Sequence, residues 1–158
     1  KNLNFNVDEI NKYFLNLSKK SLKLIVPTYK NFDEIKNCLI SLEKAREYSS
    51  NFYYISIVVS SDYINKEHHL KLSKLAKKLK FSYIQNKKRL GFVKNVDQHF
   101  DRNHDYFGIL NSDTIVDEKS IKSMLDLTSK KNVGSVTALS NEQDIFSFAR
   151  DIKILTNG

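Results

Sequence analysis

Polar side chains follow several apolar runs of the sequence, and their types suit a ligand that carries phosphate, sugar and base. The residues at these run ends, taken as one candidate set, are Pro27, Thr28, Tyr29, Ser60, Ser61, Asp62, Asn86, Arg89, Gly91, Lys94, Asn111, Ser112 and Asp113. Hydroxyl and amide groups hydrogen-bond to a sugar or a base, and guanidinium and ammonium groups neutralise phosphate oxygens. We therefore expect these residues to form a ligand site.

Asp113 is the candidate ligand for a divalent cation, Mg²⁺ or Mn²⁺, because it follows the apolar run 106–110. Hard cations bind through one or two carboxylates together with the phosphate oxygens of a ligand. The chain has 4 glycines and contains neither a Walker A motif nor G-x-G-x-x-G, so a glycine-rich phosphate loop is not expected. The alternative is that Asn111 and Asp113 only shape a turn, and the sequence leaves both readings open.

The apolar pattern along the chain predicts strands that alternate with helices. β-branched, aromatic and other apolar runs predict strands at 22–26, 53–59, 81–85, 106–110 and 133–138, the first stopped by Pro27. Apolar residues spaced three and four apart predict helices at 5–18, 66–80 and 90–100, and a further helix capped by Asp117. The same spacing at 35–45 predicts a helix that Asn31 or Asp33 could cap. Such alternation is typical of a three-layer α/β domain with a mostly parallel sheet and helices on both faces. Because the carboxyl ends of parallel strands share one edge, the candidate set should converge there.

The composition describes a folded chain with an excess of positive charge. Of 158 residues, 26 are Lys or Arg and 18 are Asp or Glu, which gives a net charge of +8, and 41% are hydrophobic. That hydrophobic fraction supports a core and argues against a disordered tail. The single cysteine, Cys38, excludes an internal disulfide framework and a cysteine-based zinc site, and its place on an apolar helical stripe predicts a core residue. No apolar run approaches the ~20 residues that a membrane-spanning helix needs.

Much of the positive charge lies in the predicted helix 66–80, which holds six lysines and one glutamate. The main interpretation is the solvated outer face of a helix that covers the sheet, because leucines alternate with the lysines at helical spacing. Contact with nucleic-acid phosphates and contact with an anionic lipid surface are the alternatives. We expect no nucleic-acid partner, since the lysines fall on the outer face of a helix, and we leave peripheral membrane contact open.

Five segments of the sequence stand in the order and spacing of a known set of motifs. Residues 24–30 resemble a V-P-T-Y-N opening, and residues 38–42 resemble a C-L-x-S-L helix. Residues 86–93 are similar to N-x-x-x-x-G-F-A/V, and residues 105–114 are similar to a strand that ends in a D-x-D-like L-N-S-D-T element. Residues 133–141 resemble a V-G-x-V-T-P-L-S-N stretch. Together they resemble family-2 glycosyltransferases with the A-type fold, including bacterial surface-polysaccharide and rhamnosyltransferase-like members.

The resemblance implies a nucleotide-diphospho-sugar transferase fold, Rossmann-like in character, that binds a nucleotide-diphosphate sugar and a divalent cation. It implies an inverting, hexosyltransferase-type reaction on a glycan or lipid-linked acceptor, in cytoplasmic synthesis of bacterial surface polysaccharide at or near the inner membrane face. By position, Asp113 matches the aspartate that faces the metal and the phosphates, and Asn111 replaces the first aspartate of a full D-x-D. Pro27, Thr28 and Tyr29 match the loop along the nucleoside.

The sequence departs from the family pattern at several places, among them Asp97, where the family often has Asn. Ser60 and Ser61 stand where the family has the acidic residues of V-V-D-D-G-S, so either Asp62 takes their role after a shift or the serine hydroxyls bind instead. The acceptor half and the usual catalytic base have no match, and the nearest carboxylates, Glu142 and Asp144, are weak candidates for that base. We therefore leave the base unassigned and keep a non-catalytic nucleotide-sugar-binding or interaction domain of a larger protein as the alternative.

The expected organisation has three parts. Residues 1–20 are predicted to hold an N-terminal amphipathic helix, because their apolar residues repeat at three and four. Residues 21–150 are predicted to form the nucleotide-sugar-binding glycosyltransferase domain that the resemblance implies. Residues 151–158 are predicted to be a truncated tail.

Overall fold

The fold of the chain is seen in a computed structural model, which describes residues 19–62 and 65–138. Strands and helices alternate along these residues, as the apolar pattern predicts. The elements in chain order are β1 (Ser21–Thr28), α2 (Phe32–Ser49), β2 (Tyr54–Ser61), α3 (Lys66–Lys78), β3 (Ser82–Gln85), α4 (Phe92–Asp97), β4 (Tyr106–Ile109) and α5 (Ser120–Thr128). The helix predicted at 5–18 and the tail at 151–158 lie outside the described residues.

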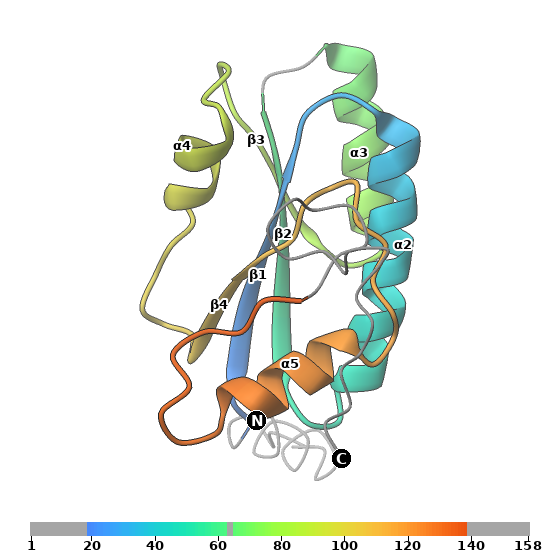
Figure 1. Cartoon of the computed structure of the whole chain (residues 1–158). Helices are drawn as coiled ribbons and strands as arrows, with labels where there is room; N and C mark the ends of the chain where they lie inside the picture. Colours follow the sequence, from blue (N-terminus) through green and yellow to red (C-terminus); the bar gives the residue numbers. More distant parts are fainter. Residues whose placement is uncertain (1–18, 63–64, 139–158) are drawn as a thin grey trace, which may run out of the picture. The chain divides into compact units, whose positions relative to one another are not determined.

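The four strands of the described residues form one parallel sheet in the order β3-β2-β1-β4 (Figure 1). α2 and α3 lie along one face of the sheet, and α4 lies on the other face (Figure 1). This arrangement confirms the predicted α/β fold with a parallel sheet and helices on both faces. From β1 the chain moves outward to β2 and β3, and it then crosses to β4 on the other side of β1. The winding reverses between β1 and β4, and open parallel sheets bind ligands at such a switch point.

The central strands are buried on both faces, which explains why their sequences are apolar without strict alternation. In β1, Leu24, Ile25 and Val26 are all buried. Ile25 pairs in register with Val58 of β2, and both pack against Val96 of α4. α2 buries an apolar stripe at helical spacing, formed by Ile35, Cys38, Leu39, Leu42 and Ala45. The helices are therefore held to the sheet by side chains that the apolar pattern identifies.

β1 continues through Pro27 to Thr28, beyond the predicted end of this strand. Backbone groups of successive strand residues point to opposite neighbours: the carbonyl of Ile25 accepts from Leu110 beside β4, and that of Thr28 accepts from Asp62 beside β2. By this alternation the nitrogen of Pro27 points toward the β4 side, where the pairing with β4 has already ended. Pro27 has no N–H to donate, and at this position the strand has no neighbour that would accept one, so the proline does not interrupt the sheet.

The strand predicted at 133–138 is wrong. These residues have no regular secondary structure, and most of them are exposed. β-branched residues favour a strand only where a neighbouring strand supplies hydrogen bonds and a surface to pack on, and this segment pairs with none of the described strands. α2 begins directly after Asn31, one of the two predicted caps, and it continues past the predicted apolar stripe to Ser49. α3 and α4 are shorter than the predicted 66–80 and 90–100.

The structure divides after Lys122 into two compact units, and the division falls within α5. Every residue of the candidate site described below belongs to the first unit. Within residues 19–62 and 65–138, no helix combines the length and the apolar character needed to cross a bilayer.

Candidate functional site

A cavity of about 300 Å³ opens at the carboxyl edge of the sheet, at the switch point between β1 and β4. Its lining residues are Pro27, Thr28, Tyr29, Asp62, Arg89, Gly91, Phe92, Asn95, Asn111, Ser112 and Asp113. They come from the ends of β1 and β2, from the segment between β3 and α4, and from the loop after β4. Segments that are distant along the sequence therefore each contribute residues to the lining, as expected for a parallel sheet.

Most of the residues predicted for the site line this cavity. Those that do are Pro27, Thr28, Tyr29, Asp62, Arg89, Gly91, Asn111, Ser112 and Asp113. Four predicted residues lie outside the lining, namely Ser60, Ser61, Asn86 and Lys94. Phe92 and Asn95 also line the cavity and were not predicted. Phe92 stands in the quoted G-F pair, a signal that could have identified it, whereas Asn95 carries no motif signal and is brought to the cavity by the turn of α4.

Asp62 joins the end of β2 to the segment that follows β3. Its carboxylate accepts hydrogen bonds from the backbone N–H of Leu90 at 2.7 Å and from that of Gly91 at 2.9 Å. Its own N–H donates to the carbonyl of Thr28 at 2.8 Å, which keeps the ends of β1 and β2 together. Gly91 has a φ of +78°, a conformation that glycine adopts without strain. Asp62 is 4% exposed, and it fixes the course of the segment that carries Arg89.

A buried polar network lies beneath the cavity, between β2 and α4. The Ser60 hydroxyl lies 2.6 Å from Oδ1 of Asn95 and 2.6 Å from Nε2 of His99. Since an amide oxygen only accepts, the hydroxyl donates to Asn95 and the ring N–H of His99 donates to the hydroxyl. Nδ2 of Asn86 also donates to Oδ1 of Asn95, at 2.8 Å. Ser60 is fully buried, so its hydroxyl supports the fold and does not reach a ligand.

The surroundings of His99 favour an uncharged network at neutral pH. Burial lowers the pKa of the His99 imidazole, and the positive charge of Lys23 lowers it further. Ser61, also fully buried, donates from its hydroxyl to the carbonyl of Asp62 at 3.2 Å. The two serines that align with acidic residues of the resembled family are therefore internal supports in this chain. At the end of β2, the carboxylate that lines the cavity is that of Asp62.

Two cationic side chains, Arg89 and Lys30, lie against the ring of Tyr29, and Arg89 also lines the cavity. The guanidinium of Arg89 lies 4.7 Å from the ring centroid, and Nζ of Lys30 lies 5.1 Å from it. Tyr29 is 36% exposed, and neither cation forms an ion pair with a described residue. Cation–π contacts at exposed sites contribute only about 0.5–1 kcal/mol, so both groups remain available to an anionic ligand.

Asp113 is exposed in the loop that follows β4. The N–H of Thr114 donates to the carbonyl of Asn111 at 3.2 Å, so the segment does form the turn that was one of the two alternatives. Asp113 nevertheless lines the cavity, which makes the turn compatible with binding of a cation.

The thiol of Cys38 donates to the carbonyl of Asn111 at 3.5 Å, and burial raises the pKa of that thiol to about 12. Cys38 is a buried support of the loop and not a nucleophile.

The oxygen atoms around the cavity suit a hard divalent cation only together with a ligand. Within the described residues, no group of three or more His, Cys, Asp or Glu side chains could hold a metal ion by itself. Asp62 and Asp113 supply the carboxylates of the lining, and Asp62 already accepts two backbone N–H groups. Mg²⁺ usually keeps several waters and binds through one or two carboxylates plus phosphates. Asp113 fits that mode of binding.

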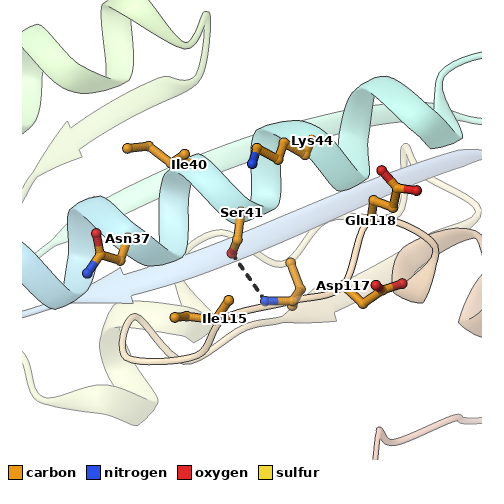
Figure 2. A pocket seen from close by; sticks show the side chains of 8 residues that line it. Asn37, Ile40, Ser41, Lys44, Ile115, Asp117 and Glu118 are labelled. Carbon is orange, nitrogen blue, oxygen red and sulfur yellow. Dashed lines mark hydrogen bonds between the residues drawn. The ribbon is translucent and has the colours of Figure 1, made fainter.

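A larger cavity, of about 440 Å³, lies between α2 and the loop that precedes α5 (Figure 2). Its lining residues are Asn37, Ile40, Ser41, Lys44, Ile115, Val116, Asp117 and Glu118. The Ser41 hydroxyl accepts from the N–H of Val116 at 3.1 Å, and Oδ1 of Asp117 accepts from the N–H of Lys119 at 2.9 Å. These groups hold the loop, and no predicted site residue lies here. We therefore place the candidate site in the smaller cavity, which most of the predicted site residues line.

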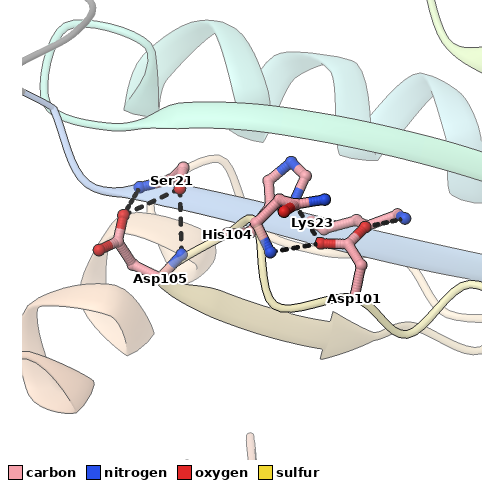
Figure 3. Close-up of polar contacts among 6 residues, drawn as sticks. Ser21, Lys23, Asp101, His104 and Asp105 are labelled. Atoms are coloured by element: carbon pink, nitrogen blue, oxygen red, sulfur yellow. Dashed lines mark hydrogen bonds and ion pairs between the residues drawn. The ribbon is translucent and has the colours of Figure 1, made fainter.

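A second charged cluster lies at the opposite, amino edge of the sheet (Figure 3). Nζ of Lys23 lies 2.5 Å from Oδ2 of Asp101, and Nδ1 of His104 lies 3.0 Å from Oδ1 of the same carboxylate. Asp105 accepts from the N–H and the hydroxyl of Ser21, at 2.7 and 2.8 Å. The hydrogen bonds from Lys23 and His104 hold the pKa of Asp101 well below its usual range. This amino-edge cluster fastens the segment before β4 to the start of β1.

Residues 23–151 match the sequence profile of glycosyl transferase family 2. No curated protein matches the chain. Two similar solved structures are S. aureus TarS, with 19% identity and a TM-score of 0.53, and S. aureus TarS 1-349, with 20% identity and a TM-score of 0.51. Each alignment covers 68% of this chain, but only 19% of the first relative and 32% of the second. The chain thus spans a minor part of both structures, and at these identities the likeness supports the fold.

Proposed function

The chain belongs to glycosyltransferase family 2, and from this membership and the carboxyl-edge cavity we propose that it transfers a sugar from a nucleotide-diphosphate donor. The proposed acceptor is a glycan or lipid-linked acceptor in the synthesis of bacterial surface polysaccharide, and the proposed setting is the cytoplasm. The observation that carries the proposal is the convergence of Tyr29, Arg89 and Asp113 on one cavity. These side chains supply a stacking surface for a base, positive charge for a diphosphate and a ligand for a cation.

In this proposal the nucleoside lies along Pro27, Thr28 and Tyr29, at the end of β1. The exposed ring of Tyr29 offers a face on which a base can stack. The diphosphate then meets Arg89 and Lys30, whose charges have no ion-pair partner among the described residues. The buried carboxylate at the end of β2 holds the backbone beside Arg89, so less chain has to be ordered when a ligand binds.

A divalent cation, Mg²⁺ or Mn²⁺, would be held by Asp113 and by the diphosphate of the donor. Such a cation, when bound, neutralises negative charge on the departing nucleoside diphosphate. Asn111 and Ser112 stand beside Asp113 in the lining and offer neutral oxygens to the same region. Arg89 and Lys30, which lie against the ring of Tyr29, would stabilise the negative charge of the leaving group as positive groups already in place.

An inverting reaction also needs a base that removes the proton from the acceptor hydroxyl. Of the carboxylates in the lining, that of Asp62 accepts two backbone N–H groups and that of Asp113 is assigned to the cation. Glu142 and Asp144, the weak candidates that follow the segment 133–138, lie outside the described residues. The base is therefore unassigned, and a domain that binds nucleotide sugar without transferring it is the second candidate function.

Calorimetric titration with a panel of nucleoside diphosphates, each with and without Mg²⁺ or Mn²⁺, tests the donor site. We expect one nucleotide to bind with clear preference and to gain affinity from the cation, because the diphosphate and Asp113 share it. A chain that binds none of these nucleotides under either condition contradicts the proposal.

Release of nucleoside diphosphate from a bound nucleotide sugar distinguishes the two candidate functions. A transferase should release it when an acceptor glycan is supplied, with the sugar recovered on that glycan. A binding domain should bind the same nucleotide sugar with the same preference and release nothing over hours.

A further inference from the structure

The outer face of α3 carries the most uneven charge of the described helices. Its exposed cationic residues are Lys66, Lys71, Lys74, Lys77 and Lys78, and Glu67 is its one acidic residue. α2, which lies on the same face of the sheet, mixes the two signs along its length, with Asp33, Glu34, Glu43 and Glu47 beside Lys36, Lys44 and Arg46. Among the described helices, such an excess of positive charge is found on α3 alone.

Most of the lysines on this face lack an acidic partner. Nζ of Lys71 pairs with Glu67 at 2.7 Å and lies 5.9 Å from the ring centroid of Phe32. The other four lysines of the face form no ion pair with a described residue. Like charges at helical spacing destabilise a helix slightly, so this face gains from a partner that carries negative charge.

An exposed leucine lies within the charged face. Leu70 is 47% exposed, whereas Leu72 and Ala76 are fully buried on the side that faces the rest of the unit. At about 100° per residue, Leu70 falls between Lys66 and Lys74 around the helix. An apolar side chain among lysines matches the chemistry of an anionic bilayer surface, where cations meet headgroups and an apolar group enters the boundary below them.

We propose that the outer face of α3 binds the anionic surface of a lipid bilayer, with its lysines at headgroup phosphates and Leu70 at the boundary with the acyl chains. Lysine is a compact charge on a flexible stem, which suits headgroups that are loosely ordered. Nucleic-acid readers use arginine and aromatic stacking on bases, and α3 contains no Arg, Phe, Tyr or Trp. Lipid is therefore the partner that the chemistry of this face favours.

The position of α3 connects this surface with the cavity. α3 starts shortly after Asp62, so its amino end lies at the carboxyl edge of the sheet, where the cavity opens. A bilayer along α3 passes close to that edge. Under the proposed function, on which this one consequence rests, the contact brings a lipid-linked acceptor near the donor site.

Flotation of the whole chain with lipid vesicles tests the surface without any donor. The vesicles consist of phosphatidylcholine alone, or of phosphatidylcholine with about a third of the anionic lipid phosphatidylglycerol. We expect the chain to float only with the anionic vesicles. Binding should weaken as the salt rises from about 0.05 M to about 0.5 M, because the screening length shortens over that range.

Two variants with an equal loss of charge separate α3 from the net charge of the chain. The α3 variant carries Lys66→Gln, Lys74→Gln, Lys77→Gln and Lys78→Gln, and the control carries Lys36→Gln, Lys44→Gln, Lys119→Gln and Lys130→Gln. Glutamine has nearly the helix propensity of lysine, so both variants should fold, as thermal unfolding will show. We expect the α3 variant to lose roughly tenfold or more of its binding to anionic vesicles, and the control less than about threefold.

Leu70→Gln is expected to remove the part of the binding that persists at high salt, since that part is apolar.

Equal losses of vesicle binding in the α3 variant and the control would show an effect of net charge and overturn the assignment to α3. Binding to duplex DNA or RNA without binding to anionic vesicles would replace lipid by nucleic acid as the partner. Neither result involves a nucleotide, so neither bears on the donor site.

Discussion

Both edges of the sheet gather charged side chains, but the two edges use the charges differently. In the amino-edge cluster, acidic and basic groups bond one another, and the carboxylate of Asp101 alone accepts from two side chains. At the carboxyl edge, Arg89, Lys30 and Asp113 form no ion pair with a described residue. Charges that satisfy one another hold the fold together, whereas charges kept apart around a cavity are available to a ligand.

Asp62 shows that position alone does not separate these two uses. It lines the cavity at the carboxyl edge, yet its carboxylate accepts backbone N–H groups as an internal support would. Its hydrogen bonds organise the segment that carries Arg89, so its effect on a ligand is partly indirect. The comparison of the two edges therefore has to be tested residue by residue.

Asp113→Asn should give the largest effect, because it removes the charge that faces the cation and keeps the size of the side chain. We expect the gain in nucleotide affinity from Mg²⁺ or Mn²⁺ to fall by about a hundredfold or more, beyond the 10–100-fold typical of a supporting residue. Calorimetric titration with and without cation measures it. Asp117→Asn, in the larger cavity, is the matched control. An equal loss of affinity in both variants would contradict the assignment of the cation to Asp113.

Arg89→Ala should weaken nucleotide binding by roughly 10- to 100-fold, since a hydrogen bond to a charged group contributes about 1.5–3 kcal/mol. The loss should be the same with and without cation, because the guanidinium acts on the phosphate directly. Arg102→Ala, which removes an exposed arginine outside the cavity, should leave the affinity unchanged. An unchanged nucleotide affinity in Arg89→Ala would show that Arg89 does not bind the ligand and only contacts Tyr29 within the fold.

His99 should make the chain less stable as the pH falls. Burial holds its pKa below the value of about 6.5 that the unfolded chain has, so the unfolded state takes up the proton first. The free energy of unfolding should therefore decrease as the pH drops through about 6.5. Tm recorded between about pH 7.5 and about pH 5.5 measures this slope. His99→Gln keeps a donor toward Ser60 and should flatten the slope; a slope as steep as that of the parent chain would contradict the assignment.

Asp101→Asn, in the amino-edge cluster, should give the smallest effect on ligand binding, with the nucleotide affinity unchanged within about twofold because the sites are distant. Its effect should appear as a lower Tm at neutral pH. The pKa of Asp101 is depressed in the folded chain, so its stabilising contribution is present above about pH 4 and is lost as the pH falls through the folded value. A loss of nucleotide affinity at unchanged Tm would break the distinction between the two edges.

Much of the cavity lining could be predicted, because the ends of parallel strands must meet at one edge. Tyr29, Arg89 and Asp113 each follow an apolar run, and that is enough to place them together. The burial of Ser60 and the presence of Asn95 in the lining could not be predicted in the same way. Both depend on how α4 packs over β1 and β2, which are far from it along the chain.

The sequence by itself determined the alternation of strands and helices and the residues that stand at strand ends, because the period of the apolar residues is a local property. Only the tertiary structure decided the strand order β3-β2-β1-β4, which places the cavity beside β1 and β4. It also decided that β1 continues through Pro27 and that 133–138 joins none of the described strands. Pairing and burial arise between residues that are distant along the chain, so a local pattern does not specify them.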